Sequence, residues 1–154
     1  MILYLSLGTN LGDRAENIER AVTQINLRIG EITTRSGNYC TEPWGFISES
    51  PFLNAAVAVS TSLSPAQVLT MTQAIERDLG RTHKSINGIY QDRIIDIDLI
   101  ISDDGSVIET PQLYLPHRLM HLRRFVLEPL CEIAPELVHP VLGKTVRELL
   151  EQLD

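Results

Sequence analysis

The sequence predicts an α+β sandwich in which helices cover both faces of one β-sheet. Strand-like and helix-like segments alternate along the chain, and two strand-like segments follow one another in its middle. The turn Asp103-Asp104-Gly105 is in addition typical of a hairpin. At 154 residues the chain is long enough to bury a core of its own, so we expect a single domain that spans residues 1–154.

The first half of the chain predicts a strand, a helix and a second strand. Residues 2–7 alternate leucine with other residues, as a strand with one buried face does. A helix is expected after Asp13, because Glu16 three residues later completes a capping box, and Gly30 is a typical helix end. Residues 31–40 suit a second strand that is polar on one side.

The middle of the chain repeats this order. Residues 52–63 favour a strand, and Ser64-Pro65 is a strong helix start because it combines a cap with a first-turn proline. We expect this helix to end at Gly80 and a buried strand to cover residues 92–101.

After that strand we expect a short hairpin partner around Val107 and Ile108, then helical pieces from Pro116 and a final helix capped by Thr145 and Glu148. The order β-α-β-β-α-β, followed by a hairpin strand and helices, predicts a split βαβ, or ferredoxin-like, mixed sheet.

Charge and composition exclude several classes of partner. With 13 basic and 20 acidic residues the net charge is −7, which argues against nucleic acid and against an anionic membrane surface. No apolar run reaches the roughly 20 residues of a membrane span, and the N-terminus lacks a cleavable signal. We expect a cytoplasmic protein in which Cys40 and Cys131 are free thiols.

The strongest chemical signal is a pair of carboxylates inside an apolar strand. Asp96 and Asp98 are two residues apart, so they share one face at roughly 6–7 Å along the strand, while the odd positions 95–101 form the apolar face. Such a pair is costly without a cation, and oxygen ligands of this kind suit Mg²⁺. The alternative is an edge strand whose carboxylates face solvent and pair with Lys or Arg.

Cations gather around this pair in the sequence although the chain is acidic overall. Two metal-type carboxylates that face several basic side chains can hold a polyphosphate, with guanidinium groups gripping its oxygens. The alternative is that each of these basic side chains is an independent, solvated surface residue. The basic residues are Arg81, His83, Lys84, Arg93, His117, Arg118, His121, Arg123 and Arg124.

Four other residues are interpreted here from their chemistry and pattern alone. From its chemistry alone Glu76 is an ordinary exposed glutamate. Asn54 either makes structural hydrogen bonds within the protein or hydrogen-bonds the edge of a heterocyclic ligand. Phe52 and Phe125 are core residues by their pattern. The loop of residues 41–51, with its exposed aromatic residues, is of the length that often carries function.

Taken together, these segments resemble the 6-hydroxymethyl-7,8-dihydropterin pyrophosphokinases of folate biosynthesis over nearly the whole chain. The matching segments are Leu7-Gly8-Thr9-Asn10-Leu11-Gly12, Phe52-Leu53-Asn54-Ala55-Ala56, Ile75-Glu76, Leu79-Gly80-Arg81, Asp92-Arg93, Asp96-Ile97-Asp98, Leu115-Pro116-His117, Arg123-Arg124-Phe125, Leu127-Glu128-Pro129-Leu130 and Glu132-Ile133-Ala134-Pro135.

The resemblance implies that the β,γ-pyrophosphoryl group of ATP passes to the hydroxymethyl group of a reduced pterin, leaving AMP. It implies two Mg²⁺ ions on Asp96 and Asp98, ATP contacts from Gln73 and Glu76, and a monomer whose partners are ATP and the pterin. The implied phosphate and catalytic contacts are Arg81, Lys84, Arg93, His117 and Arg123. The implied pterin contacts are Thr41, Pro43, Trp44, Gly45, Phe52, Asn54 and Phe125, with the two phenylalanines on either side of the ring.

Two departures concern the second long loop. His83 stands where many members carry an arginine, and residues 86–91 replace a shorter tryptophan-containing turn. The aromatic lid then passes to Tyr90 or to Trp44, between which the sequence does not choose. Two rival functions also remain: a nucleotidyltransferase that uses the same aspartates and releases pyrophosphate, and a non-enzymatic ligand-binding regulator on the same fold.

Overall fold

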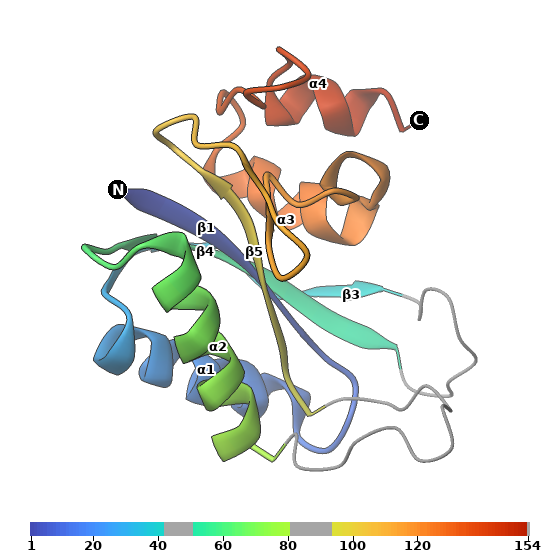
Figure 1. The fold of residues 1–154 in the computed structure, drawn as a ribbon. Helices are drawn as coiled ribbons and strands as arrows, with labels where there is room; N and C mark the ends of the chain where they lie inside the picture. The colour runs from blue at the N-terminus through green and yellow to red at the C-terminus, as the bar shows by residue number, and fades with distance from the viewer. Residues whose placement is uncertain (42–50, 81–93, 154) are drawn as a thin grey trace.

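The computed structural model describes residues 1–41, 51–80 and 94–153 (Figure 1). In chain order its elements are β1 (Ile2–Thr9), α1 (Arg14–Arg28), β2 (Glu31–Arg35), β3 (Tyr39–Thr41), β4 (Phe52–Ser60), α2 (Pro65–Asp78), β5 (Asp96–Ser102), β6 (Ile108–Glu109), β7 (Tyr114–Leu115), the 3-10 helix η2 (Met120–Leu122), α3 (Arg124–Ile133) and α4 (Val146–Glu151). The α+β class expected from the sequence is confirmed.

The helices begin where local capping chemistry predicts. The Asp13 carboxylate accepts from the Glu16 backbone N–H at 3.1 Å, and α1 starts with the next residue, Arg14. Ser64 and Gln67 form a complete capping box before α2, as Thr145 and Glu148 do before α4. Each box satisfies backbone donors that a helix start would otherwise leave without partners.

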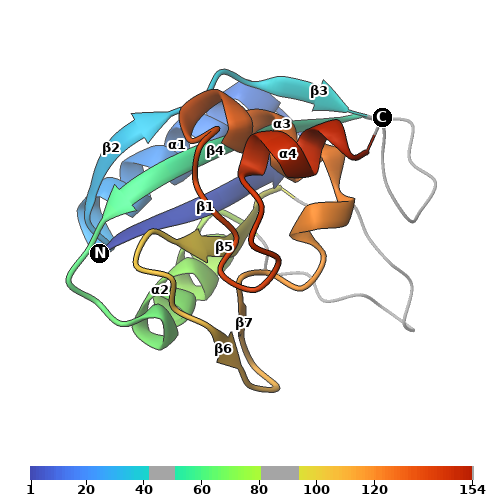
Figure 2. The same cartoon turned by 90° about the horizontal axis from the view of Figure 1, so that it is seen from above.

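The main sheet runs in the order β2-β4-β1-β5, with β3 beside β4 (Figure 2). Every pairing within the described residues is antiparallel, so the expectation of a mixed sheet is wrong. The physical reason is that the strands joined by a helix are not neighbours in the sheet. β4 lies between β1 and β2, and β1 lies between β4 and β5, and each intervening strand runs in the opposite direction.

Two hydrophobic cores lie on opposite faces of this sheet. Alternate residues of β1, β4 and β5 pack against α1 and α2, with the fully buried Leu3, Leu5 and Leu7 of β1 among them. The opposite face packs against α3, and α4 covers α3 (Figures 1 and 2). Helices therefore cover both faces, as expected.

Strand β5 differs from the sequence expectation in two respects. It lies at the end of the strand order and pairs only with β1 among the described residues, so it is an edge strand rather than an interior one. Leu99 lies opposite Leu5 and Ile101 opposite Tyr4, so a bulge falls at Ile100. The bulge turns Ile101 into the core beneath α3, whereas the alternation predicted it on the face of Leu99.

The expected hairpin of residues 103–108 with the preceding strand is also wrong. β6 pairs with β7, with Ile108 opposite Leu115, in a small separate sheet (Figure 2). After β5 the chain stays attached to β1, because Asp103 donates its backbone N–H to the Ile2 carbonyl and its carboxylate accepts from the Ile2 N–H.

The single strand expected over residues 31–40 is divided into β2 and β3. Ser36 interrupts it, and its hydroxyl accepts from the Ala56 N–H of β4 at 2.9 Å. The Glu132 carboxylate of α3 then accepts from the Gly37 N–H at 3.2 Å and from the Tyr39 hydroxyl at 2.5 Å. These hydrogen bonds to β4 and α3 fix the segment between β2 and β3. The strand expected over 52–63 is likewise shorter and ends at Ser60.

Candidate active site

The site is built on the face of the sheet that packs against α3. In the strand register Gly8 of β1 lies opposite Asn54 of β4 on one side and opposite Asp96 of β5 on the other. Because neighbouring strands are about 4.8 Å apart, the backbones of Asn54 and Asp96 are about 10 Å apart across Gly8. Ser6 and Asp98 form the next row on that face.

Gly8 keeps the middle of this row free of a side chain. A Cβ atom there would lie 3.1 Å from Oδ1 of Asn54 and 3.7 Å from Cδ1 of Phe52. The backbone of Gly8 is therefore the floor between the amide of Asn54 and the carboxylate of Asp96. Asn54 is buried, at 3% exposure, in the row that also carries Asp96.

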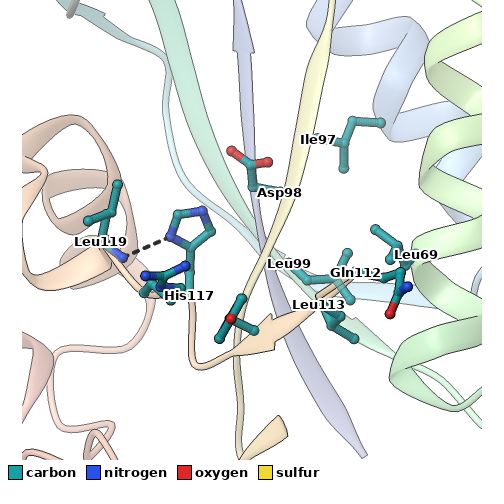
Figure 3. A pocket seen from close by; sticks show the side chains of 10 residues that line it. Leu69, Ile97, Asp98, Leu99, Gln112, Leu113, His117 and Leu119 are labelled. Atoms are coloured by element: carbon teal, nitrogen blue, oxygen red, sulfur yellow. Dashed lines mark hydrogen bonds between the residues drawn. The ribbon is translucent and has the colours of Figure 1, made fainter. Parts of the chain in front are cut away.

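Asp96 and Asp98 are half-buried and share one face of β5. Figure 3 shows the Asp98 carboxylate on the same side of β5 as the His117 imidazole, whereas Ile97 points to the side of α2. Within the described residues no group of three His, Cys, Asp or Glu side chains could enclose a metal ion. Two carboxylates on one strand face suit a cation such as Mg²⁺, which takes one or two protein carboxylates and fills its other positions with water and phosphate oxygens.

Glu76 of α2 reaches the same strand from its outer edge. Its Oε2 accepts from the backbone N–H of Ile97, between the two aspartates, at 2.8 Å. The side chain is only 6% exposed, so the expectation of an ordinary exposed glutamate is wrong. Gln73, one turn earlier on α2, is exposed.

His117 is fixed by two backbone contacts. Its own N–H donates to the Ile100 carbonyl of β5 at 2.7 Å, and its Nδ1 accepts from the Leu119 N–H at 3.1 Å (Figure 3). The proton of the neutral ring is consequently on Nε2. Burial lowers the pKa of His117, the Arg123 guanidinium lowers it further, and Asp96 acts in the opposite direction. His117, Arg123 and Asp96 therefore lie within electrostatic reach of one another.

The start of α3 supplies the remaining described residues. The Arg123 guanidinium lies 5.5 Å from the centroid of the Phe125 ring, at which distance a cation–π attraction operates. Phe125 packs against the core beneath α3, and Phe52 lies beside Gly8, at the beginning of β4. Phe125 is thus a packed ring beside Arg123, and Phe52 lies next to the polar row.

The structure also reveals a pocket of about 440 Å³ beside Asp98 that the sequence did not predict (Figure 3). His117 and Arg118 lie at its polar side, and Arg118 is 4.5 Å from the centroid of the Tyr114 ring. The residues that were missed are Leu69, Leu99, Gln112, Leu113, Tyr114 and Leu119. They come from separate segments that only the fold brings together, and no motif in the sequence marks them.

Several predicted site residues lie outside the described residues, and their predicted roles stay predictions. These are Pro43, Trp44, Gly45, Arg81, His83, Lys84, Tyr90 and Arg93. Thr41 ends β3, where its backbone is paired with Phe52.

Two carboxylates, a histidine and an arginine near an apolar pocket are typical of the class of proteins that bind an anionic ligand together with a divalent cation. The family is given by comparison. The family model of 7,8-dihydro-6-hydroxymethylpterin-pyrophosphokinase (HPPK) matches residues 4–135. This chain belongs to that family.

Curated relatives carry the name 2-amino-4-hydroxy-6-hydroxymethyldihydropteridine pyrophosphokinase. One from Porphyromonas gingivalis is 50% identical over 139 residues, which cover 90% of this chain and 94% of the relative. One from Methylorubrum extorquens is 43% identical and covers 98% of this chain and 92% of its own length, and one from Bacillus subtilis is 40% identical over 88% and 79%.

Solved structures show the same fold. A Plasmodium falciparum HPPK-DHPS crystal structure with pteroate superposes with a TM-score of 0.77 at 20% identity, over 98% of this chain and 42% of that chain. An HPPK-DHPS crystal structure in complex with substrates gives a TM-score of 0.73 at 16% identity, over 98% and 43%. This chain thus spans less than half the length of these solved chains.

Proposed function

We propose that this protein transfers the β,γ-pyrophosphoryl group of ATP to the hydroxymethyl group of 6-hydroxymethyl-7,8-dihydropterin and releases AMP, as a step of folate biosynthesis. The observation that carries the proposal is the row of Asn54, Gly8 and Asp96, which ends beside His117 and Arg123. Asn54 would hydrogen-bond the edge of the pterin at one end of this row. Asp96, with His117 and Arg123, would bind metal and phosphate at the other end.

The pocket beside Asp98 supports ATP as the donor. Its apolar lining from Leu69, Leu99 and Leu113 suits the base of a nucleotide, and Arg118 stacked on Tyr114 suits a planar ring or a ribose. A nucleotide seated there has its phosphates directed along β5, past Asp98 toward Asp96, His117 and Arg123. In this proposal Gln73 also contacts ATP, and Arg81, Lys84 and Arg93 complete the phosphate contacts.

Divalent cations belong with the phosphates in this proposal, and Asp96 and Asp98 would hold two Mg²⁺ ions. Bound there, they would neutralise phosphate oxygens and favour in-line displacement at the β-phosphorus. Asp96 and Asp98 orient the phosphate chain, and Arg123 offsets its negative charge. Because burial and Arg123 lower the pKa of His117, the ring is neutral at pH 7 and donates from Nε2 rather than supplying a full charge.

The acceptor lies on the floor made by Gly8. Asn54 pairs with the amide edge of the pterin, the backbone from Thr41 to Gly45 shares this task, and Phe52 and Phe125 hold the faces of the ring. No protein nucleophile takes part, because the substrate hydroxyl attacks. The rate gain thus comes from positioning two substrates and from neutralising charge.

The described strand order supports the finer assignment to a ferredoxin-like, split βαβ topology, because both crossovers skip the strand between them. We further propose that residues 1–154 act as one catalytic domain, as a monomer in the cytoplasm. In the described residues no helix is long and apolar enough to cross a membrane.

Separation of the products by ion-exchange chromatography tests this function. The protein is incubated with ATP, the pterin and Mg²⁺, and with EDTA in place of Mg²⁺ as the control. The proposal predicts equal amounts of AMP and pterin diphosphate, and none of either with EDTA. Release of pyrophosphate would instead support a nucleotidyltransferase, and tight ligand binding without any product would support a regulator.

A further inference from the structure

We propose that Glu76 is a positioning residue that fixes the geometry of Asp96 and Asp98 through the backbone between them, in place of the direct ATP contact expected from the resemblance. The inference rests on the proposed function, because it concerns the cation that this aspartate pair would hold. It starts from a buried carboxylate that meets a strand edge at the center of the site.

The first step is the location of the contact. β5 is the edge strand of the described sheet, so its outer backbone groups have no neighbouring strand there. The Glu76 carboxylate accepts from the Ile97 N–H on this edge at 2.8 Å. A helix side chain thus takes the place that a further strand would occupy.

The second step concerns the two aspartates on either side. Successive residues of a strand direct their backbone N–H groups to opposite edges. Since the Ile97 N–H is directed outward to Glu76, those of Asp96 and Asp98 are directed toward β1, where their partners in register are Gly8 and Ser6. Three successive residues are therefore held alternately from β1 and from α2.

The third step concerns how firmly Glu76 itself is held in place. Glu76 is 6% exposed and lies next to Ile75, which is fully buried in the core beneath α1 and α2. The backbone of α2 at Glu76 therefore cannot shift without disturbing that core. Groups that orient metal ligands from outside the coordination sphere typically change metal affinity 10- to 100-fold when they are removed. Such a loss is expected here because the Glu76 carboxylate holds the backbone between the two aspartates.

Two variants separate the hydrogen bond from the charge. Glu76→Ala removes both, whereas Glu76→Gln keeps an oxygen that can accept from Ile97 and removes only the charge. Thr72→Ala is the matched control: Thr72 is fully buried one turn earlier on α2, and its hydroxyl donates within the helix to the Leu69 carbonyl. It perturbs the same helix without removing the contact to β5.

Amide hydrogen exchange of the ligand-free protein provides the first readout. We expect the Ile97 amide to exchange at least about tenfold faster in Glu76→Ala, relative to the other amides of β5, because this amide loses its charged hydrogen-bond acceptor. Glu76→Gln should remain closer to wild type, and Thr72→Ala should show the wild-type pattern. Unchanged Ile97 exchange in Glu76→Ala would overturn the proposal.

Binding of Mn²⁺ with a non-hydrolysable ATP analogue, followed by electron paramagnetic resonance, provides the second readout. We expect a loss of about 10- to 100-fold in Mn²⁺ affinity for Glu76→Ala, a smaller loss for Glu76→Gln and none for Thr72→Ala. Equal losses in the alanine and glutamine variants would overturn the positioning role in favour of a direct effect of charge. Wild-type affinity in Glu76→Ala would overturn it outright.

The two readouts also keep this inference apart from the proposed function. A wild-type protein that binds no Mn²⁺ with the nucleotide would overturn the proposed function and this inference with it. A wild-type protein that binds both, beside a Glu76→Ala variant that binds them equally well, would overturn only the role of Glu76.

Discussion

The two faces of the central sheet differ in what their side chains do. Beneath α1 and α2 the strands present mainly apolar residues, including the fully buried Leu5 of β1. On the face of α3 the same strands carry an apolar core at one end and the row of Asn54, Gly8 and Asp96 at the other. Side-chain alternation lets one strand serve both purposes, so stability and chemistry can be altered separately.

Removal of the aspartate pair should affect the chemistry alone. Replacing Asp96 and Asp98 together with alanine is expected to lower kcat by more than about 1,000-fold, because metal ions supply several kcal/mol of charge stabilisation. The free energy of unfolding should stay the same or rise, since two neighbouring negative charges are removed. Turnover is measured by AMP release and stability by urea unfolding. Wild-type turnover in the double variant would contradict the metal assignment.

Truncation of a core side chain on the opposite face should lower stability and leave the chemistry unchanged. Leu5→Ala is expected to lower the free energy of unfolding by about 2–5 kcal/mol, because Leu5 is fully buried and its loss leaves a cavity. Below the unfolding transition, kcat per folded molecule should remain close to wild type. Urea unfolding and a kinetic assay on the same sample give both values. A large loss of kcat without a loss of stability would show that the two faces are not separate.

A methyl group on the floor of the site should act on the acceptor substrate. Gly8→Ala places its Cβ about 3.1 Å from Oδ1 of Asn54, so the amide has to shift. We expect KM for the pterin to rise about tenfold, the equivalent of about 1.4 kcal/mol, with KM for ATP little changed. Gly37→Ala is the matched control, because its Cβ would meet nothing closer than 3.9 Å. An equal rise in both KM values would contradict the placement of the pterin.

The smallest effect concerns a histidine away from the aspartates. His139 is 6% exposed, and its Nδ1 accepts from the N–H groups of Val141 and Leu142. Burial, with His121 nearby, lowers the pKa of His139 below the ordinary value of 6.5. The unfolded chain then binds a proton at a higher pH than the folded one. The free energy of unfolding should therefore decrease as the pH falls from about 6.5 through the lowered pKa.

His139→Gln should reduce this slope, because one of the groups that take up a proton on unfolding is gone. His117, whose pKa is also lowered, contributes in the same direction and remains in the variant. Urea unfolding between about pH 5.5 and 7.5 measures the slope in both proteins. An identical slope in wild type and variant would contradict the role given to His139.

Features that depend on neighbouring residues in the sequence were predictable. The start of α2 follows from Ser64, Pro65 and Gln67, because a helix cap is made within four residues. The same-face placement of Asp96 and Asp98 follows from strand periodicity alone. The pattern therefore predicted both the start of a helix and the central pair of the site.

Features that depend on how distant segments meet were not predictable. The bulge at Ile100 arises from the register with β1, and the pairing of β6 with β7 depends on the course of the chain after β5. Burial of Glu76 depends on the packing of α2 beside the edge of the sheet. No local pattern reports these contacts, which is why the sequence predicted an interior strand and an exposed glutamate.

A crystal structure of the protein with Mn²⁺, a non-hydrolysable ATP analogue and the pterin would locate the metal by anomalous scattering. We expect Mn²⁺ peaks within about 2.0–2.3 Å of carboxylate oxygens of Asp96 and Asp98, with analogue phosphates completing the coordination. Mn²⁺ peaks elsewhere, with the carboxylates of Asp96 and Asp98 directed to bulk solvent, would contradict the proposed site and with it the pyrophosphoryl transfer.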